Sequence, residues 1–281
     1  MRSTTAELLL HRFYQTSFLN VLGIRLPLTA FSFRHFQAWA IDNLDEVQRQ
    51  MLEQGILVYQ RQKAPGLKAE PLLRYLSATG LPIRSLLDFG CGTGRISRYL
   101  ASRLPSLERI VGVDTDRSVL PDVVRIGNAD ADWLTDLSSL RQNEQFDMIA
   151  IVHTLHHVHQ DAQVSLLAQL AQRLRSGGVL YLVEDSWDEA RVARESNVFD
   201  RVFNALPTEL KRSVFRKNDD ISNNWFYQRD LPVDDCWYRS MKEWTMLLDM
   251  CGLIPVSHDV VGFKSDRLHG VPNGWIIARR E

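Results

Sequence analysis

Cysteine is scarce in this chain of 281 residues, which contains only Cys91, Cys236 and Cys251. The three lie far apart in the sequence and form no C-x-x-C pair. This spacing argues against a disulfide framework and against a cysteine-bound structural zinc site. It is typical of proteins from a reducing compartment, and we predict a cytoplasmic location.

Long apolar runs and an excess of basic residues are also missing. No apolar run approaches the roughly 20 residues that span a bilayer. Near the N-terminus, His11 and Arg12 directly follow three leucines, which leaves too short a core for a signal peptide. The 33 Lys and Arg are balanced by 34 Asp and Glu, for a net charge of −1. We therefore expect neither a nucleic-acid partner nor stable membrane insertion.

The residue pattern divides the chain into successive segments. Apolar residues at helical spacing predict a helical N-terminal cap over residues 1–80. Short apolar runs separated by helix-like segments predict a doubly wound, mostly parallel α/β sheet over residues 81–185. Residues 186–240 combine helical patterns with an aromatic-rich stretch, and we interpret them as a substrate-cap insertion. Residues 241–281 predict a helix and two strands that complete the α/β core.

The run LLDFGCGTGR, residues 86–95, places Gly90, Gly92 and Gly94 directly after a buried strand. Open α/β sheets bind ligands at the carboxyl ends of their strands. The glycines permit a tight turn and a close approach of a ligand to the main chain, and the following helix offers N–H groups. The next strand ends in Asp114, where a carboxylate can accept hydrogen bonds from both hydroxyls of a ribose. The pattern predicts a nucleoside site.

The spacing of the glycines distinguishes a dinucleotide site from other nucleoside sites. In the dinucleotide fingerprint G-x-G-x-x-G, the third glycine comes one residue later than Gly94 does here. The run DFGCGTGR followed by VGVDTD instead resembles the class I S-adenosylmethionine-dependent methyltransferases. FDMIAIVHTLHHV and LAQRLRSGGVLYLVED resemble later parts of the same fold. The resemblance covers residues 83–185 well and 241–281 loosely, and it implies a Rossmann-like sheet with an antiparallel final strand.

The resemblance also implies the cofactor, S-adenosyl-L-methionine, and its contacts. The glycine loop and Asp88 are expected to hold the methionine end, with Cys91 contributing its backbone alone. Asp114 is expected to hold the ribose, and the segment that begins at Asp130, or alternatively at Asn128, the adenine. The expected cofactor-binding residues are Asp88, Gly90, Cys91, Gly92, Gly94, Asp114, Asp130, Ala131, Trp133 and His153.

Three residues at strand ends are candidates for the chemistry. His153 directly follows the apolar run MIAIV and is placed to accept the proton of an oxygen or nitrogen nucleophile. Glu184 and Asp185 end the next strand and are expected to face the same crevice. The stretch HTLHHVHQ does not predict a metal site, because adjacent histidines point apart and no carboxylate at helical spacing completes a ligand set.

The segments outside the resemblance are expected to decide the substrate. Residues 1–80 and 186–240 are rich in aromatic residues, which favours a cap over an enclosed small molecule. We predict methyl transfer to an oxygen, nitrogen or carbon of a small, partly apolar or aromatic metabolite. Two alternatives stay open: a non-methylating descendant of the fold, such as a cyclase or a cofactor-binding subunit, and an NAD-dependent oxidoreductase, which the early third glycine disfavours.

Overall fold

A computed structural model describes most of the chain, and its contacts divide it into two compact units. The first unit comprises residues 1–60, 185–240 and 260–273, and the second comprises residues 61–184, 241–259 and 274–281. The residues that the structure describes are 5–14, 44–47, 49–50, 54, 64–189, 198–219, 235–263 and 271–281.

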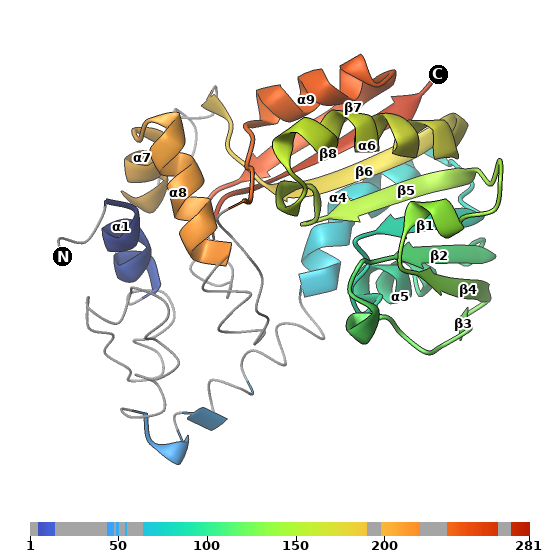
Figure 1. Ribbon diagram of the computed structural model, residues 1–281, viewed down its shortest axis with the longest axis horizontal. Coiled ribbons are helices and arrows are strands. Elements are labelled where there is room, and N and C mark those ends of the chain that lie inside the picture. The colour runs from blue at the N-terminus through green and yellow to red at the C-terminus, as the bar shows by residue number, and fades with distance from the viewer. Residues whose placement is uncertain are drawn as a thin grey trace. The chain divides into compact units, whose positions relative to one another are not determined.

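The second unit is built on an eight-stranded sheet with the strand order β3-β4-β2-β1-β5-β6-β8-β7 (Figure 1). Neighbours among β4, β2, β1, β5 and β6 are parallel, whereas β3 pairs antiparallel with β4. The prediction of a mostly parallel sheet with an antiparallel final strand is thus confirmed, and the antiparallel β3 at the other edge adds to it. The strands are β1 Ser85–Phe89, β2 Arg109–Val113, β3 Arg125–Ile126, β4 Ala129–Leu134, β5 Phe146–Val152, β6 Leu174–Asp185, β7 Leu253–Val261 and β8 Asn273–Arg280.

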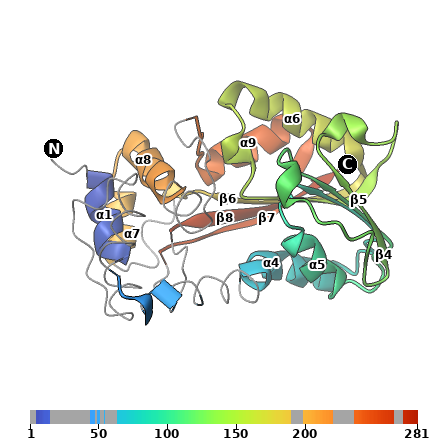
Figure 2. The ribbon, with the colours of Figure 1, turned by 60° about the horizontal axis from the view of Figure 1, so that its bottom comes forward.

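Helices cover both faces of this sheet, with α6 and α9 on one face and α4 and α5 on the other (Figure 2). The central strands are therefore buried on both sides, which is why β1 and β5 read as continuous apolar runs without polar alternation. The doubly wound α/β class predicted from the sequence is confirmed. The helices are α4 Ala64–Thr79, α5 Arg95–Ala101, α6 Gln160–Arg173 and α9 Met241–Met250.

Two details add to or differ from the sequence prediction. The run VVRIGNADADWL contains two strands, because Gly127 adopts a left-handed φ of 58° and turns β3 back onto β4. Helix α4 packs in the core of the second unit through Leu72 and Leu76, although it falls within the segment predicted as a cap.

The first unit is organised around aromatic side chains. Its described helices are α1 Thr5–Tyr14, α7 Val198–Asn204 and α8 Thr208–Asp219, and α1 contacts both of the others. Phe13 meets Phe263 edge-on at 5.0 Å between ring centres, and Phe203 meets Phe263 at 5.6 Å. The aromatic residues Phe31, Phe33, Phe36, Trp39, Trp225, Phe226 and Tyr227, which we expect in a cap, lie outside the described residues.

Among the described helices, none has both the length and the apolar character that a membrane crossing requires.

Candidate functional site

The glycine loop follows β1 and is fastened to the end of β2. Gly90, Gly92 and Gly94 have φ angles of 73°, 50° and 69°, in the left-handed region that glycine enters without strain. The carbonyl of Val113 accepts hydrogen bonds from the N–H groups of Gly90 (2.7 Å) and Cys91 (3.0 Å). These bonds hold the loop at the carboxyl edge of the sheet, where the sequence predicts it.

Asp114 lies directly beside this loop. Its Oδ2 accepts a hydrogen bond from the Gly92 N–H at 2.8 Å, and its Oδ1 accepts one from the Asp116 N–H at 3.0 Å. Because each carboxylate oxygen has two acceptor positions, both oxygens retain one for a ligand hydroxyl. The bonds orient the carboxylate and leave it able to accept further hydrogen bonds. It can therefore bind the hydroxyls of the ribose of a nucleoside cofactor.

Asp88 lies beneath the loop rather than on its surface. The carboxyl is buried and accepts a 2.6 Å hydrogen bond from the Ser97 hydroxyl, which joins β1 to α5. Burial raises the pKa of Asp88 to about 6, although the bonds from Ser97 oppose this shift. Burial likewise raises the pKa of the Cys91 thiol, which keeps it neutral. We interpret both as residues that position the loop.

Trp133 packs against the glycine loop from the neighbouring strand β4. A Cβ atom added to Gly94 or to Gly112 would collide with its indole ring. The indole N–H donates a 2.6 Å hydrogen bond to the Val123 carbonyl, which fixes the orientation of the ring. Trp133 is thus placed within reach of a ligand on the loop.

The other residues of the expected adenine segment lie elsewhere. Asp130 pairs with Arg109 at the start of β2, whereas Leu134 pairs with Val113 at its end. At roughly 3.3 Å per residue, Asp130 lies about 13 Å from the carboxyl edge of the sheet. Ala131 is buried in the core. This register contradicts the expectation that Asp130 and Ala131 contact adenine.

Asp136 takes the place at the edge that we expect for Asp130. It follows the end of β4 by two residues, and its Oδ1 accepts hydrogen bonds from the N–H groups of Ser138 (2.7 Å) and Ser139 (3.2 Å). The bond from the Ser138 hydroxyl, with those backbone bonds, lowers the pKa of Asp136. In the sequence, the D-x-S-S turn signal at residues 136–139 marks this position.

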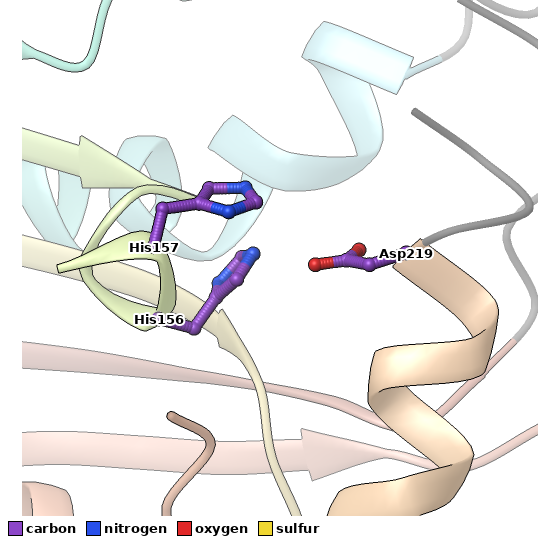
Figure 3. A group of neighbouring side chains, drawn as sticks. All are labelled: His156, His157 and Asp219. Atoms are coloured by element: carbon purple, nitrogen blue, oxygen red, sulfur yellow. The ribbon is translucent and has the colours of Figure 1, made fainter. Parts of the chain in front are cut away.

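A turn rich in histidine follows β5 (Figure 3). His153 has a φ of 51°, unusual for a residue other than glycine, and its N–H donates a 2.8 Å hydrogen bond to the Val183 carbonyl. His156 is buried and His157 exposed, with their ring centres 4.1 Å apart. Asp219, also drawn in Figure 3, belongs to the first unit, where it accepts a hydrogen bond from the Tyr238 hydroxyl.

Glu184 holds this turn in place from the neighbouring strand β6. Its Oε1 accepts hydrogen bonds from the N–H groups of Thr154 (3.0 Å) and Leu155 (2.7 Å), and its Oε2 is bonded to His156 Nδ1. Burial opposes ionisation of Glu184, but the charge and hydrogen bond of His156 hold its pKa below the ordinary value. Because Glu184 is buried and these bonds all go to the histidine turn, we interpret it as a positioning residue for the turn that carries His153.

The histidine turn also touches the glycine loop. A Cβ atom on Gly90 would overlap the side chain of Thr154, so the two segments are packed as closely as their backbones allow. The structure therefore brings Asp114, Trp133 and His153 to one edge of the second unit. Asp114 is bonded to the glycine loop, Trp133 packs against it, and His153 lies on the turn that touches it. Asp185, the last residue of β6, is buried and is grouped with the first unit.

Three comparisons bear on this site. Residues 86–178 match a family described as a methyltransferase domain. The chain is 31% identical over 190 residues to a ribosomal RNA small subunit methyltransferase C of Ectopseudomonas mendocina, covering 57% of this chain and 55% of that protein. It is 33% identical over 106 residues to an uncharacterized methyltransferase of Mycobacterium tuberculosis, covering 37% and 51%. The chain thus spans about half the length of the curated relatives it matches.

A solved structure is similar in fold along nearly the whole chain. It is a 1,6-didemethyltoxoflavin-N1-methyltransferase of Burkholderia thailandensis with bound 1,6-didemethyltoxoflavin and S-adenosylhomocysteine. The TM-score is 0.52 at 19% identity, over 92% of this chain and 93% of that one. At this identity the similarity concerns the fold alone.

Proposed function

Since this chain belongs to the class I S-adenosylmethionine-dependent methyltransferase superfamily, we propose that it methylates an oxygen, nitrogen or carbon atom of a small, partly apolar or aromatic metabolite. S-adenosylmethionine is the cofactor that this family uses. The observation that carries the proposal is the Asp114 carboxylate, bonded to the glycine loop with acceptor positions left for a ribose. We also propose a cytoplasmic location, in keeping with three free cysteines.

The cofactor, when bound, supplies an activated methyl group on a positively charged sulfur. The residues of this chain would then act mainly by position, since holding two reactants in near-attack geometry lowers the barrier by several kcal/mol. In this proposal, Asp114 holds the ribose, Asp136 and Trp133 border the adenine, and the loop glycines admit the methionine end. His153 accepts a proton at an imidazole nitrogen where the nucleophile is a hydroxyl. Glu184 keeps the His153 turn in place.

Calorimetry with S-adenosylhomocysteine tests the cofactor assignment. We expect a dissociation constant in the micromolar range, about −7 to −8 kcal/mol, and its loss in Asp114→Ala. His153→Ala is expected to keep the affinity and to lower turnover by about 10²–10⁴-fold if the nucleophile is a hydroxyl. Binding of NAD in place of S-adenosylhomocysteine would refute the assignment in favour of an oxidoreductase. Turnover of substrates without transfer of labelled methyl would point to the non-methylating alternative.

A second candidate substrate is ribosomal RNA. The similarity to ribosomal RNA small subunit methyltransferase C favours it, although that match covers 55% of the relative. The net charge of −1 disfavours it, because RNA-binding surfaces depend on basic residues. Methylation of small aromatic acids and amines, assayed beside ribosomal RNA with labelled cofactor, separates the two candidates.

A further inference from the structure

Trp187 carries an unsatisfied hydrogen-bond donor in the interior of the first unit. It is the second residue beyond the end of β6, and only 1% of its surface is exposed. Among the described residues, its indole Nε1 is one of four buried side-chain nitrogens without a hydrogen-bond partner. A buried donor left unpaired is destabilising, so this nitrogen calls for an acceptor.

The side chain of Lys211 lies over the same indole ring. The Nζ atom of Lys211, on α8, is 6.0 Å from the centre of the Trp187 ring, and the residue is 6% exposed. Burial lowers the pKa of Lys211, while the charge of Glu189 opposes this shift. The Lys211 backbone N–H donates to the Pro207 carbonyl, but among the described residues its ammonium forms no ion pair within 4.0 Å. The ammonium is not one of the four fully buried nitrogens that lack a partner, so Nζ reaches solvent and can take an anion as its partner.

Aromatic rings surround these two donors. Phe215 stacks on Trp187 with ring centres 6.0 Å apart and an angle of 24° between the rings. Phe203 and Tyr238 pack against Phe215, at 5.4 Å and 5.2 Å between centres. All four aromatic residues are fully buried. A ligand at this place would meet aromatic rings and two nitrogen donors. The Tyr238 hydroxyl is bonded to the buried Asp219, and among the described residues the carboxylate whose charge acts on Lys211 is that of Glu189.

We propose that Trp187 and Lys211 bind the carboxylate of an apolar or aromatic acid. One carboxylate oxygen would accept a hydrogen bond from Trp187 Nε1, and the ammonium of Lys211 would form a charge-assisted bond with the same group. The apolar part of the acid would lie against the aromatic rings. We further infer that this acid is the methyl acceptor, and that step rests on the proposed function. The binding of the acid to Trp187 and Lys211 does not depend on the proposed function.

Nuclear magnetic resonance of the indole N–H groups tests the site in the full chain. Trp187→Phe identifies the Trp187 signal as the one that disappears from the spectrum of ¹⁵N-labelled protein. Sodium benzoate is the probe, and benzamide is its neutral counterpart of the same shape. We expect benzoate to shift the Trp187 signal in the wild type, and benzamide to bind at least about tenfold more weakly.

Variants at Lys211 separate charge from packing. Lys211→Met is expected to weaken benzoate binding at least about tenfold, and Lys211→Arg to retain most of it. Lys242→Met, which removes an exposed lysine on α9, is the matched control and should leave binding unchanged.

Two results would overturn the site: a Trp187 signal that benzoate does not move, or equal binding of benzoate and benzamide in the wild type. Both use the unaltered chain, so they hold even if Lys211→Met fails to fold. Calorimetry with S-adenosylhomocysteine on the same samples reports separately on the proposed function, because loss of cofactor binding leaves the benzoate result intact.

Discussion

Two buried carboxylates support the candidate site from opposite sides, and their pKa values shift in opposite directions. Asp88 accepts bonds from the neutral Ser97, which do not offset burial, so its pKa rises to about 6. Glu184 is equally buried, but the charge of His156 and the bonds from His156 and two backbone N–H groups outweigh burial, so its pKa falls. The charge of the neighbouring group, rather than the degree of burial, separates the two carboxylates.

The raised pKa of Asp88 makes stability depend on pH. Its folded pKa of about 6 exceeds the unfolded value, so its stabilising contribution is complete below about pH 4 and is lost as the pH rises through 6. Relative to Asp88→Asn, the free energy of unfolding of the wild type should fall by up to about 3 kcal/mol between pH 4 and pH 7. Urea denaturation at several pH values, followed by circular dichroism, measures this difference.

Asp147 provides a control of opposite sign. Burial opposes its ionisation, but bonds from the Arg84 N–H and from Arg175 hold its pKa below the ordinary value. Its contribution is therefore present above the unfolded pKa and is lost as the pH falls through the folded one. A wild-type pH dependence that persists unchanged in Asp88→Asn would show that Asp88 is not the group responsible.

At the scale of elements, the length of β4 decides which aspartate reaches the carboxyl edge. Its pairing with β2 continues through Leu134, and the Asp114 N–H donates to the Leu134 carbonyl at 3.0 Å. If Asp136 borders the adenine, Asp136→Ala should weaken S-adenosylhomocysteine binding about tenfold, the typical effect of losing one hydrogen bond to a charged group. Asp130→Ala, which removes an exposed aspartate within β4, is the matched control and should leave the affinity unchanged. If calorimetry instead shows weaker binding in Asp130→Ala and unchanged binding in Asp136→Ala, Asp130 is the adenine contact.

The contact between the glycine loop and the histidine turn gives a second prediction at this scale. Gly90→Ala adds left-handed strain of about 1–2 kcal/mol and a clash with Thr154 that costs about 1–3 kcal/mol more. Gly80→Ala has the same strain, since Gly80 has a φ of 63°, but open space around its Cβ. We therefore expect Gly90→Ala to be the more destabilising in urea denaturation and to impair cofactor binding.

The Gly90→Ala variant has an internal check. Adding Thr154→Ala removes the overlapping hydroxyl and methyl groups, so the double variant should recover part of the lost stability. Equal effects of Gly80→Ala and Gly90→Ala would mean that the loop and the turn are not in close contact.

At the scale of the whole molecule, charge is the property that separates the two candidate substrates. With a net charge of −1, the chain lacks the basic excess that drives non-specific RNA binding. We expect no shift of a ribosomal RNA hairpin in a gel assay at about 150 mM salt, where phosphate contacts are strongly weakened. A specific shift under these conditions, lost on raising the salt further, would instead favour RNA as the substrate.

The sequence by itself determined the parts of this protein that depend on local pattern. Short apolar runs predicted β1, β2 and β5, because strands covered on both faces need no polar residues. The three glycines predicted the left-handed loop, since side chains are strained there. Asp114 was found by its place at the end of the next strand. Each of these inferences needs only neighbouring residues.

The tertiary structure alone decided what depends on partners distant in the sequence. Asp130 lies within β4 and Asp136 follows its end, and only the pairing of β4 with β2 shows which of them lies at the carboxyl edge of the sheet. Glu184 was predicted to face the crevice, but its bond to Thr154 spans 30 residues and turns its carboxylate toward the histidine turn. Register and hydrogen-bond partners depend on which strands become neighbours. The strand order in turn depends on how the whole sheet is buried, which no local run of residues determines.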